Sequence, residues 1–400
     1  MFFFCKFNLN IIVVDFIMKG YKGVIYMKKF ALSAMCVALT LVTLVSCSKK
    51  EAKATVSEGN ELRVAMVTDS GDITDQSFNQ TTYEACKSFS ESEGVDFKYY
   101  KPAGDTTADR VASINAAIDD GYNVVVLPGY LFGEAIVETA GLNSDVKFIG
   151  LDIGAGDLGG YTLPANVFCA VYSEEIPGFM AGYAAVKEGY RHLGFLGGMA
   201  VPAVIRYGYG FEQGCNKAAE DLGISDEVTV EYVYGGQFYG DQSITTAMDA
   251  WYSQRGVEVV FACGGGIWTS ACEAAAKVGG KVIGVDTDQT AQINAYGEGM
   301  CVTSAMKGLA ATVKAALTAV KNGNWDQYSQ KISTLGLVSA TDMESNFVQL
   351  PTDTWTMKNF TVAEYKAMVA DIYNGNITVS NSVDALPAHS ITVNTYANLK

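Results

Sequence analysis

The sequence predicts an α/β protein with two doubly wound lobes, each built on a parallel sheet. From residue 62 to about residue 320, short β-branched runs alternate with amphipathic helical stretches. Strands that are apolar along their whole length and alternate with helices are typical of parallel sheets covered on both faces. These strand–helix units are too numerous for one small sheet. We therefore expect two lobes, with the first crossing between them near residues 164–175.

The predicted elements follow from local pattern. Val111, Ile114 and Ile118 recur at helical spacing in the stretch DTTADRVASINAAIDDG, and TSACEAAAKVGG ends in a glycine pair that suits a helix end. The candidate strands are LRVAMV (62–67), NVVVLP (123–128), VKFIGL (146–151), HLGFLG (192–197), VTVEYVY (228–234), VEVVFA (257–262) and KVIGV (281–285).

The predicted strands run into glycines and carboxylates. In open parallel sheets, ligands bind in the crevice at the carboxyl ends of the strands. Glycines let the backbone approach a ligand closely, and carboxylates accept hydrogen bonds. Two lobes with such edges predict a ligand-binding cleft. The residues at these strand ends are Asp69, Gly129 and Asp152 in the first half, and Gly198, Gly264, Gly265, Gly266 and Asp286 in the second.

The amino-terminal segment is expected to be a leader rather than part of the fold. From Met27, two lysines, an apolar run and the sequence LVSC are typical of a secretory signal, and Cys47 at the cleavage point makes it resemble a bacterial lipoprotein signal. Cys47 would then be the lipid-bearing first residue. The alternative, a transmembrane anchor, is disfavoured because the apolar run 30–46 is short for a span. We assign residues 1–46 to the leader and residues 47–61 to the lipid anchor and tether. The part of the leader before Met27 is interpreted as an over-extended reading frame.

Charge and cysteine content narrow the classes of partner. Without the leader, which carries five lysines and one aspartate, the net charge falls from −15 to −19. This argues against nucleic acid and against an anionic membrane surface as partners. With no CxxC pair and two histidines, no metal or other cofactor is expected. The remaining cysteines lie mostly in apolar segments and are expected to be buried rather than disulfide-bonded: Cys86, Cys169, Cys215, Cys263, Cys272 and Cys301.

No segment matches a catalytic or metal-binding motif completely. The stretch DTDQTAQINAYGE starts like a calcium loop, but Ala291 and Gly297 stand where that loop needs glycine and glutamate. GGGIWTSA lacks the G-x-G-x-x-G pattern and the lysine of a phosphate-binding loop. VDTD (285–288) has some similarity to the aspartate cluster of nucleoside hydrolases, which keeps hydrolysis as an alternative. Neither His192 nor His389 lies near an obvious nucleophile.

The segment VTDSGDITDQSFNQ (67–80) is the best candidate for a ligand wall. Thr74 or Asp75 is expected to cap a helix. That leaves Phe78 and Asn79 in the first turn, facing the cleft. An aromatic face there can stack on a planar ligand, and the neighbouring amide can donate to and accept from its edge.

These residues resemble the basic membrane protein family, nucleoside-binding lipoproteins that include the purine nucleoside receptors. The resemblance implies a type I periplasmic-binding fold, two lobes joined by a multi-strand hinge, that delivers nucleosides to an ABC permease. The segments that carry it are TDSGDITDQSFNQTTYEACKSF, IPGFMAGYAA (176–185), GFLGGMAVPAV with GYGFEQG (194–214), KVIGVDTDQ (281–289), VTSAMKG (302–308) and IYNGNITV (372–379).

The resemblance also implies residue roles. Phe78 would stack on the base, while Asn79 and Asp152 contact its polar edge. Asp286 would accept hydrogen bonds from the ribose hydroxyls and Lys307 would be a second sugar contact. Further candidates for the ligand wall are Asp69, the glycine turn at Gly265, and, as second aromatic, Phe238 or Trp268. The chain departs from the family where Thr74, Asp75 and Gln76 replace an acid pair and a lysine.

The sequence thus predicts a non-enzymatic protein, held at the cell membrane by its lipid alone and facing the periplasm or cell exterior. It would capture purine nucleosides for an ABC permease. The first lobe is expected to comprise 62–168 and 302–325, and the second 169–301 and 326–400. Two alternatives stay open: the same fold binding a free sugar, and a nucleoside-cleaving hydrolase.

Overall fold

A computed structural model describes residues 61–69 and 71–400 of the chain. Two sheets organise these residues, and all strand pairs are parallel except β10 with β12. The first sheet has the order β11 (Lys331–Leu335), β5 (Val167–Tyr172), β4 (Lys147–Leu151), β3 (Val124–Pro128), β1 (Arg63–Val67) and β2 (Asp96–Tyr100). The second has the order β12 (Val348–Gln349), β10 (Cys301–Lys307), β9 (Lys281–Asp286), β8 (Val259–Cys263), β6 (His192–Gly197), β7 (Thr229–Tyr234) and β13 (Thr392–Thr395).

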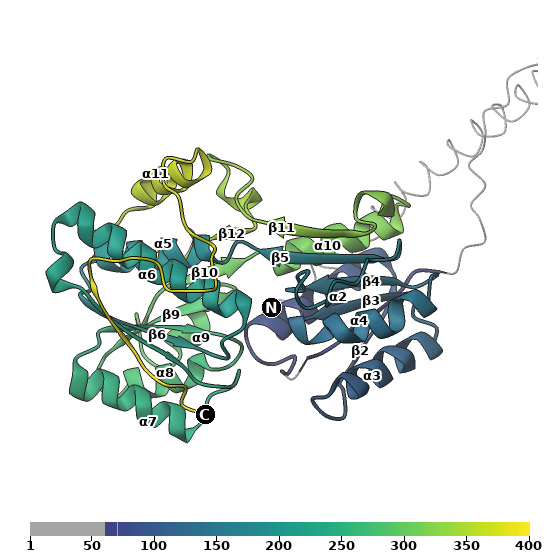
Figure 1. The fold of residues 1–400 in the computed structure, drawn as a ribbon, viewed down its shortest axis with the longest axis horizontal. Coiled ribbons are helices and arrows are strands. Elements are labelled where there is room, and N and C mark those ends of the chain that lie inside the picture. The colour runs from purple at the N-terminus through teal and green to yellow at the C-terminus, as the bar shows by residue number, and fades with distance from the viewer. Residues whose placement is uncertain (1–60, 70) are drawn as a thin grey trace, which may run out of the picture. The chain divides into compact units, whose positions relative to one another are not determined.

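Helices cover both faces of each sheet (Figure 1). The first sheet carries α2 (Phe78–Glu93), α3 (Thr107–Asp119), α4 (Gly133–Thr139) and α10 (Leu309–Lys321). The second carries α5 (Glu175–Glu188), α6 (Pro202–Leu222), α7 (Gln242–Ala250), α8 (Trp268–Ala275), α9 (Thr290–Asn294) and α11 (Val362–Tyr373). Short 3-10 or π turns lie at Tyr130–Phe132, Ala140–Leu142, Ser225–Glu227, Trp251–Arg255, Trp325–Gln327 and Met343–Ser345.

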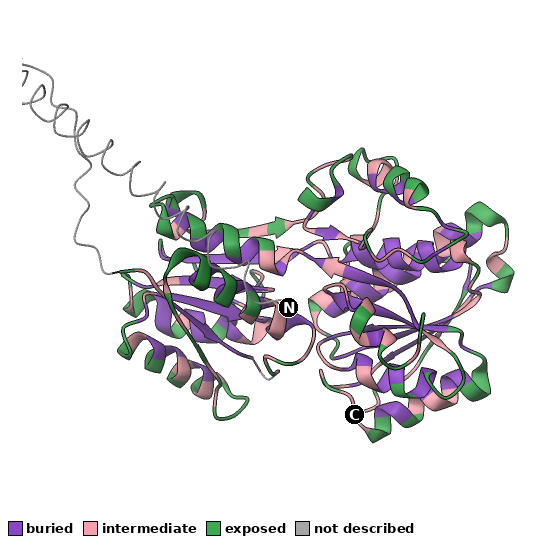
Figure 2. Ribbon diagram, turned by 180° about the vertical axis from the view of Figure 1, so that it is seen from behind, coloured by how far each residue is buried: buried purple, intermediate pink, exposed green. Residues whose placement is uncertain are grey.

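The two-residue period of the strands divides each lobe into two cores. In β1, Val64 and Met66 pack with α2 and α10, whereas Ala65 and Val67 pack with α3 and α4. The second lobe repeats this division, with α5 and α6 on one face and α7 and α8 on the other. The central strands are buried and the outer helix faces are exposed (Figure 2). This is the doubly wound arrangement that the apolar strands predicted.

The structure corrects the predicted lobe boundaries. Strand β10 belongs to the second sheet and β11 to the first, the reverse of their predicted assignment, while β5 lies wholly in the first sheet. Helix α10 packs against α2 in the first lobe, as predicted. The chain therefore crosses after β5, after β10 and again after β11. Local pattern identifies a strand but not the sheet that it joins, which explains the error.

Two further expectations concern cysteines and the amino-terminal segment. The six cysteines of the described part are free and buried, which confirms the prediction. The leader and Cys47 lie outside the described residues. Within 61–69 and 71–400, no helix combines the length and the apolar content that a bilayer crossing requires.

Candidate functional site

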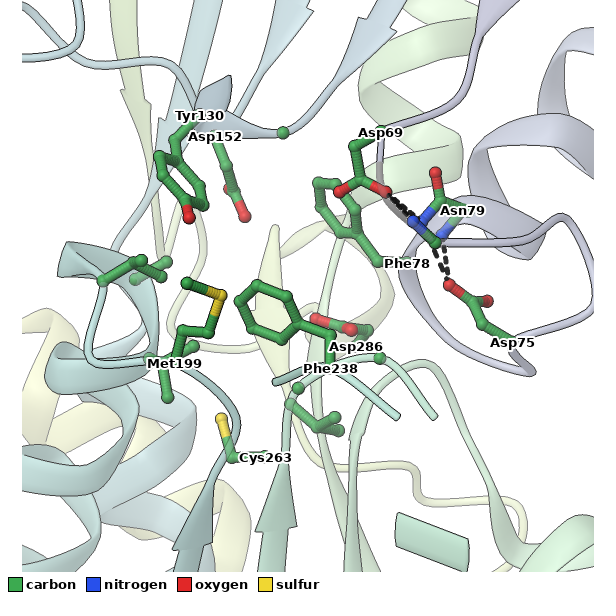
Figure 3. Close-up of a pocket in the computed structure, with 18 of the residues that line it drawn as sticks. Asp69, Asp75, Phe78, Asn79, Tyr130, Asp152, Met199, Phe238, Cys263 and Asp286 are labelled. Carbon is green, nitrogen blue, oxygen red and sulfur yellow. Dashed lines mark hydrogen bonds between the residues drawn. The ribbon is translucent and has the colours of Figure 1, made fainter. Parts of the chain in front are cut away.

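A pocket of about 790 Å³ lies where the carboxyl ends of the two sheets meet. Its size is within the range of roughly 300–1,000 Å³ that is usual for small-molecule sites. Both lobes contribute lining residues (Figure 3). The predicted site residues among them are Asp69, Phe78, Asn79 and Asp152 from the first lobe, and Phe238, Gly265, Asp286 and Lys307 from the second.

Asp75 fixes the start of α2 as a side-chain acceptor, although the N-cap position is Ser77 rather than the expected Thr74 or Asp75. Its carboxylate accepts hydrogen bonds from the backbone amides of Ser77 (2.8 Å), Asn79 (2.9 Å) and Gln80 (3.0 Å). These amides would otherwise lack partners at a helix start. Phe78 is thereby held as the first helical residue, with its side chain directed at the pocket (Figure 3).

Asn79 is held between two aspartates. Its Nδ2 donates to Asp69 Oδ1 (2.9 Å) and to Asp75 Oδ2 (3.2 Å), as the dashed lines in Figure 3 show. Burial raises the pKa of Asp69 to about 6. The Oδ1 of Asn79 is buried and has no hydrogen-bond partner among the described residues. Asn79 is therefore fixed through its amide nitrogen, and its oxygen is an unpaired buried acceptor beside the pocket.

Of the two candidates for the second stacking aromatic, Phe238 lines the pocket, on the loop between β7 and α7 (Figure 3). Its ring rests on glycines at the ends of neighbouring strands. A Cβ at Gly198 would lie 2.5 Å from Phe238 Cδ1, and one at Gly264 would lie 2.9 Å from the same atom. Gly264 has φ +133° and Gly265 has φ +52°, conformations that favour glycine. These strand-end glycines, which were predicted to let the backbone approach a ligand, instead make room for the Phe238 ring that lines the pocket.

Trp268, the alternative second aromatic, does not line the pocket. Its indole Nε1 donates to the carbonyl oxygen of Asp75 (3.3 Å), and its ring meets that of Tyr296 edge-on. Helix α8 begins at Trp268 and points this side chain at the loop before α2 rather than into the pocket. The structure therefore brings Phe238 to the pocket and gives Trp268 a contact between the lobes.

Lys307 is the buried cation of the site. Its Nζ is ion-paired with Asp152 and lies 3.5 Å from Asp286 Oδ1 and 3.9 Å from Glu174 Oε1. Burial lowers the pKa of Lys307, but the three carboxylates outweigh it and raise the pKa above its ordinary value. The ammonium is therefore protonated at neutral pH. It also lies 4.7 Å from the centroid of the Phe78 ring.

Asp152 and Asp286 occupy equivalent places at the ends of β4 and β9. Both have positive φ, +55° and +67°, which is uncommon for residues other than glycine. Such strain persists where surrounding structure enforces it, commonly at functional sites. Asp286 Oδ2 accepts a hydrogen bond from Ser77 Oγ at 2.5 Å, so this second-lobe carboxylate also touches the first lobe. Burial raises the pKa of Asp286.

The lobes are in direct contact beside the pocket. Gln289 Nε2 donates to the backbone carbonyl of Gln76 (2.8 Å), and Gln292 Nε2 donates to Gln76 Oε1 (3.2 Å). Together with the contacts of Ser77 and Trp268, these bonds describe a closed cleft.

Sequence reasoning missed several lining residues. Tyr130 follows Gly129 at the end of β3, so the strand-end rule could have found it. Arg206 and Tyr207 come from the first turns of α6 and carried no such signal. Arg206 Nε donates to Glu174 (2.6 Å), which also faces Lys307. Across the described residues, no group of three or more His, Cys, Asp or Glu side chains is placed to hold a metal ion.

Comparison with known proteins identifies the family. Residues 62–377 match the family model Bmp, described as "ABC transporter substrate-binding protein PnrA-like". The chain belongs to this family. The resemblance to the basic membrane proteins is thereby confirmed, and the family comprises extracytoplasmic substrate-binding proteins of ABC transporters.

Two relatives illustrate the similarity. The ABC transporter nucleoside-binding protein BmpA of Lactococcus lactis is 28% identical over 278 residues, which cover 66% of this chain and 75% of BmpA. Basic membrane protein B of Borreliella burgdorferi is 25% identical over 254 residues, which cover 62% of this chain and 71% of that protein.

Solved structures agree with the fold. An ABC transporter system solute-binding protein from Conexibacter woesei superposes with a TM-score of 0.63 at 22% identity, covering 80% of this chain and 99% of that chain. With the two parallel-sheet lobes described above, this confirms the type I periplasmic-binding fold.

Proposed function

We propose that this member of the Bmp family captures nucleosides, with a preference for purine nucleosides, and presents them to an ABC permease. The observation that carries the proposal is the pairing of aromatic and polar groups in one closed pocket. Phe78 and Phe238 come from opposite lobes, and Asp286 and Lys307 lie beside them. The name of the Lactococcus relative, a nucleoside-binding protein, supports the same ligand class.

In this proposal the base lies between Phe78 and Phe238. Stacking on aromatic side chains contributes about 1–3 kcal/mol per base. Asp69, Asn79 and Asp152 line the same pocket and supply acceptors for the base edge. A purine presents more ring area to the two aromatic faces than a pyrimidine does, which is the physical basis for the proposed preference.

The ribose is assigned to Asp286 and Lys307. A carboxylate can accept from two vicinal hydroxyls at once, and charged hydrogen bonds are stronger than neutral ones. Lys307 neutralises the buried carboxylates and leaves ammonium protons for a sugar oxygen. Asp286 also accepts from Ser77, so ribose binding and lobe contact share one side chain. We infer that the ligand and the direct contacts stabilise closure together, by hinge motion of the lobes.

The charge of the lining favours a neutral ligand over a nucleotide. Aspartates outnumber basic residues in the pocket lining by seven to three. Each basic residue is already ion-paired: Lys101 with Asp72, Arg206 with Glu174, and Lys307 with Asp152. A phosphate would face uncompensated carboxylates, so nucleoside monophosphates should bind weakly or not at all.

We further propose that Cys47 carries the lipid that holds the protein at the membrane surface. The tether that follows would leave the two lobes free to reach the permease. Both statements rest on the signal-like sequence before Cys47 and on the family. Globomycin-sensitive processing and incorporation of labelled palmitate, lost in Cys47→Ser, would test them.

A competition panel tests the ligand class. Thermal unfolding is recorded with adenosine, guanosine, inosine, cytidine, ribose and guanosine monophosphate, and chromatography follows free base over several hours. Stabilisation by purine nucleosides alone, with no base released, is the expected result. Equal stabilisation by ribose would point to a sugar receptor, and accumulation of free base to a hydrolase; either contradicts the proposal.

A further inference from the structure

The last segment of the chain, residues 378–400, lies beyond the part matched by the family model. We call this segment the strap. It leaves α11 and crosses the second lobe to the edge of its sheet, drawn in yellow in Figure 1. Ser380 exchanges hydrogen bonds with the side chain of Gln213 on α6 (2.8 and 3.0 Å). Ser390 contacts Asn216 on the same helix (2.7 Å). Hydrogen bonds thus fix the strap to α6 at two positions.

The strap then joins the sheet as β13. Thr392 to Thr395 pair in parallel with Thr229 to Tyr232 of β7. Beyond β13 the pairing continues, because the amide of Tyr396 donates to Tyr232 O (2.9 Å) and that of Leu399 donates to Tyr234 O (3.0 Å). The strap therefore follows β7 toward its carboxyl end, where the ligand-binding loop begins.

Lys400 makes the contact with that loop. Its Nζ donates to Gln237 Oε1 (2.8 Å) and is ion-paired with Asp241. Its main chain packs on Gly236, where an added Cβ would lie 2.9 Å from the carbonyl oxygen of Lys400. Gln237 is 8% exposed, and its Nε2 in turn donates to Tyr239 O (2.9 Å) and Asp241 Oδ2 (3.1 Å). Gln237 thus connects the loop to Asp241 at the start of α7, and Lys400 contacts both of these residues.

Phe238 sits between these supports. On one side, Gly198 and Gly264 form its seat, and the amide of Gly266 donates to Phe238 O (2.8 Å). On the other side, Gln237 is held by Lys400. Removing the Lys400 side chain would take away a hydrogen-bond partner of Gln237 Oε1 and the ion pair with Asp241, and would leave one end of the loop free to shift.

We propose that the strap is a positioning element of the ligand site, which fixes the 235–241 loop through Lys400 and so fixes the ring of Phe238. The proposal deepens the proposed function and rests on nucleoside binding in the cleft. An edge strand also protects a sheet from pairing with other chains. A strap with that role alone would stabilise the fold without affecting the ligand.

The test compares Lys400→Ala, Lys400→Arg and a deletion of 397–400 with wild type, with Lys366→Ala on an exposed face of α11 as matched control. Calorimetry with guanosine or adenosine should show affinity about fivefold lower in Lys400→Ala, since a partly exposed ion pair is worth up to about 1 kcal/mol. The deletion should lose at least as much. Lys400→Arg should retain most of the affinity, and the control all of it.

A double-mutant cycle separates positioning from general stability. In a Phe238→Ala background, Lys400→Ala should cost no further affinity, because its effect passes through Phe238. Additive losses would overturn the proposal, as would unchanged affinity in both Lys400→Ala and the deletion.

Amide hydrogen exchange in ligand-free protein gives a readout that does not depend on the ligand. Exchange at Gly235, Gly236 and Gly266 should be about fivefold faster in Lys400→Ala, with unchanged rates in the Lys366→Ala control. Equal exchange rates in Lys400→Ala and wild type would refute the positioning role of the strap. Failure of wild type to bind any nucleoside would refute the proposed function instead, and exchange would still decide the role of the strap.

Discussion

Replacement of Asp286 by asparagine removes one charge from the pocket and leaves its shape nearly unchanged. Asp286 is 5% exposed, accepts from Ser77 at 2.5 Å and lies 3.5 Å from Lys307 Nζ. Asparagine can still accept from Ser77, and Lys307 keeps Asp152 and Glu174 as counter-charges. The variant should therefore fold, and its defect should appear in ligand binding.

The expected loss follows from the type of hydrogen bond. A bond to a charged group contributes about 1.5–3 kcal/mol, and the neutral amide also offers one acceptor where the carboxylate offered two. Loss of that contribution corresponds to an affinity about 10- to 150-fold weaker. Calorimetric titration with a purine nucleoside measures it directly.

Asp288→Asn is the matched control, because Asp288 follows in the same loop but bonds Thr290 and Thr354 outside the pocket. It should bind as wild type does. Affinity of Asp286→Asn within twofold of wild type, in a protein with normal thermal stability, would refute the ribose assignment.

Three further predictions concern the other walls of the site. Phe238→Ala should weaken nucleoside affinity by about 1–3 kcal/mol, the usual value of a stacked base. Trp268→Ala should cost less affinity because its ring lies outside the pocket. A larger calorimetric loss of affinity in Trp268→Ala than in Phe238→Ala would contradict this. Asp69 has a raised pKa, about 6 against 3.8, so the native state holds its proton more tightly than the unfolded chain does. As pH rises from about 4 to about 6, the unfolding free energy of wild type should consequently fall relative to that of Asp69→Asn. Urea denaturation measures both values, and a difference between them that stays constant over this pH range would contradict the prediction. Lys307→Met should lower the unfolding free energy by about 3–5 kcal/mol because it leaves buried carboxylates unpaired. A loss below about 1 kcal/mol in urea denaturation would show that the ion-pair cluster is not buried as described.

The central strands could be predicted from sequence, and the edge strands could not. Strands β1, β3, β4, β6, β7, β8 and β9 are short, mainly apolar runs buried on both faces, so their composition is distinctive. Strands β2 and β11 lie at the edges of the first sheet and are largely exposed, and charged or polar residues interrupt any apolar run in DFKYY and KISTL. The sheet to which β10 and β11 belong depends on crossings of the chain, which no local pattern encodes.

The site was predictable where a rule links sequence to position. The carboxyl ends of parallel strands meet at one edge, and Asp69, Asp152 and Asp286 lie at such ends. Phe238 and Trp268 could not be separated, because both follow second-lobe strands on glycine-containing loops. The choice depends on how Gly198 and Gly264 seat one ring and on the direction in which α8 begins. Contacts such as Ser77 with Asp286, 209 residues apart, leave no trace in local sequence.

The most direct measurement is calorimetric titration of protein lacking the leader and Cys47, refolded to remove bound ligand, with guanosine, adenosine, inosine and ribose in separate runs. We predict one-to-one binding of the purine nucleosides and no heat from ribose. Heat from ribose equal to that from the nucleosides, or no binding of any nucleoside to folded protein, would contradict this prediction.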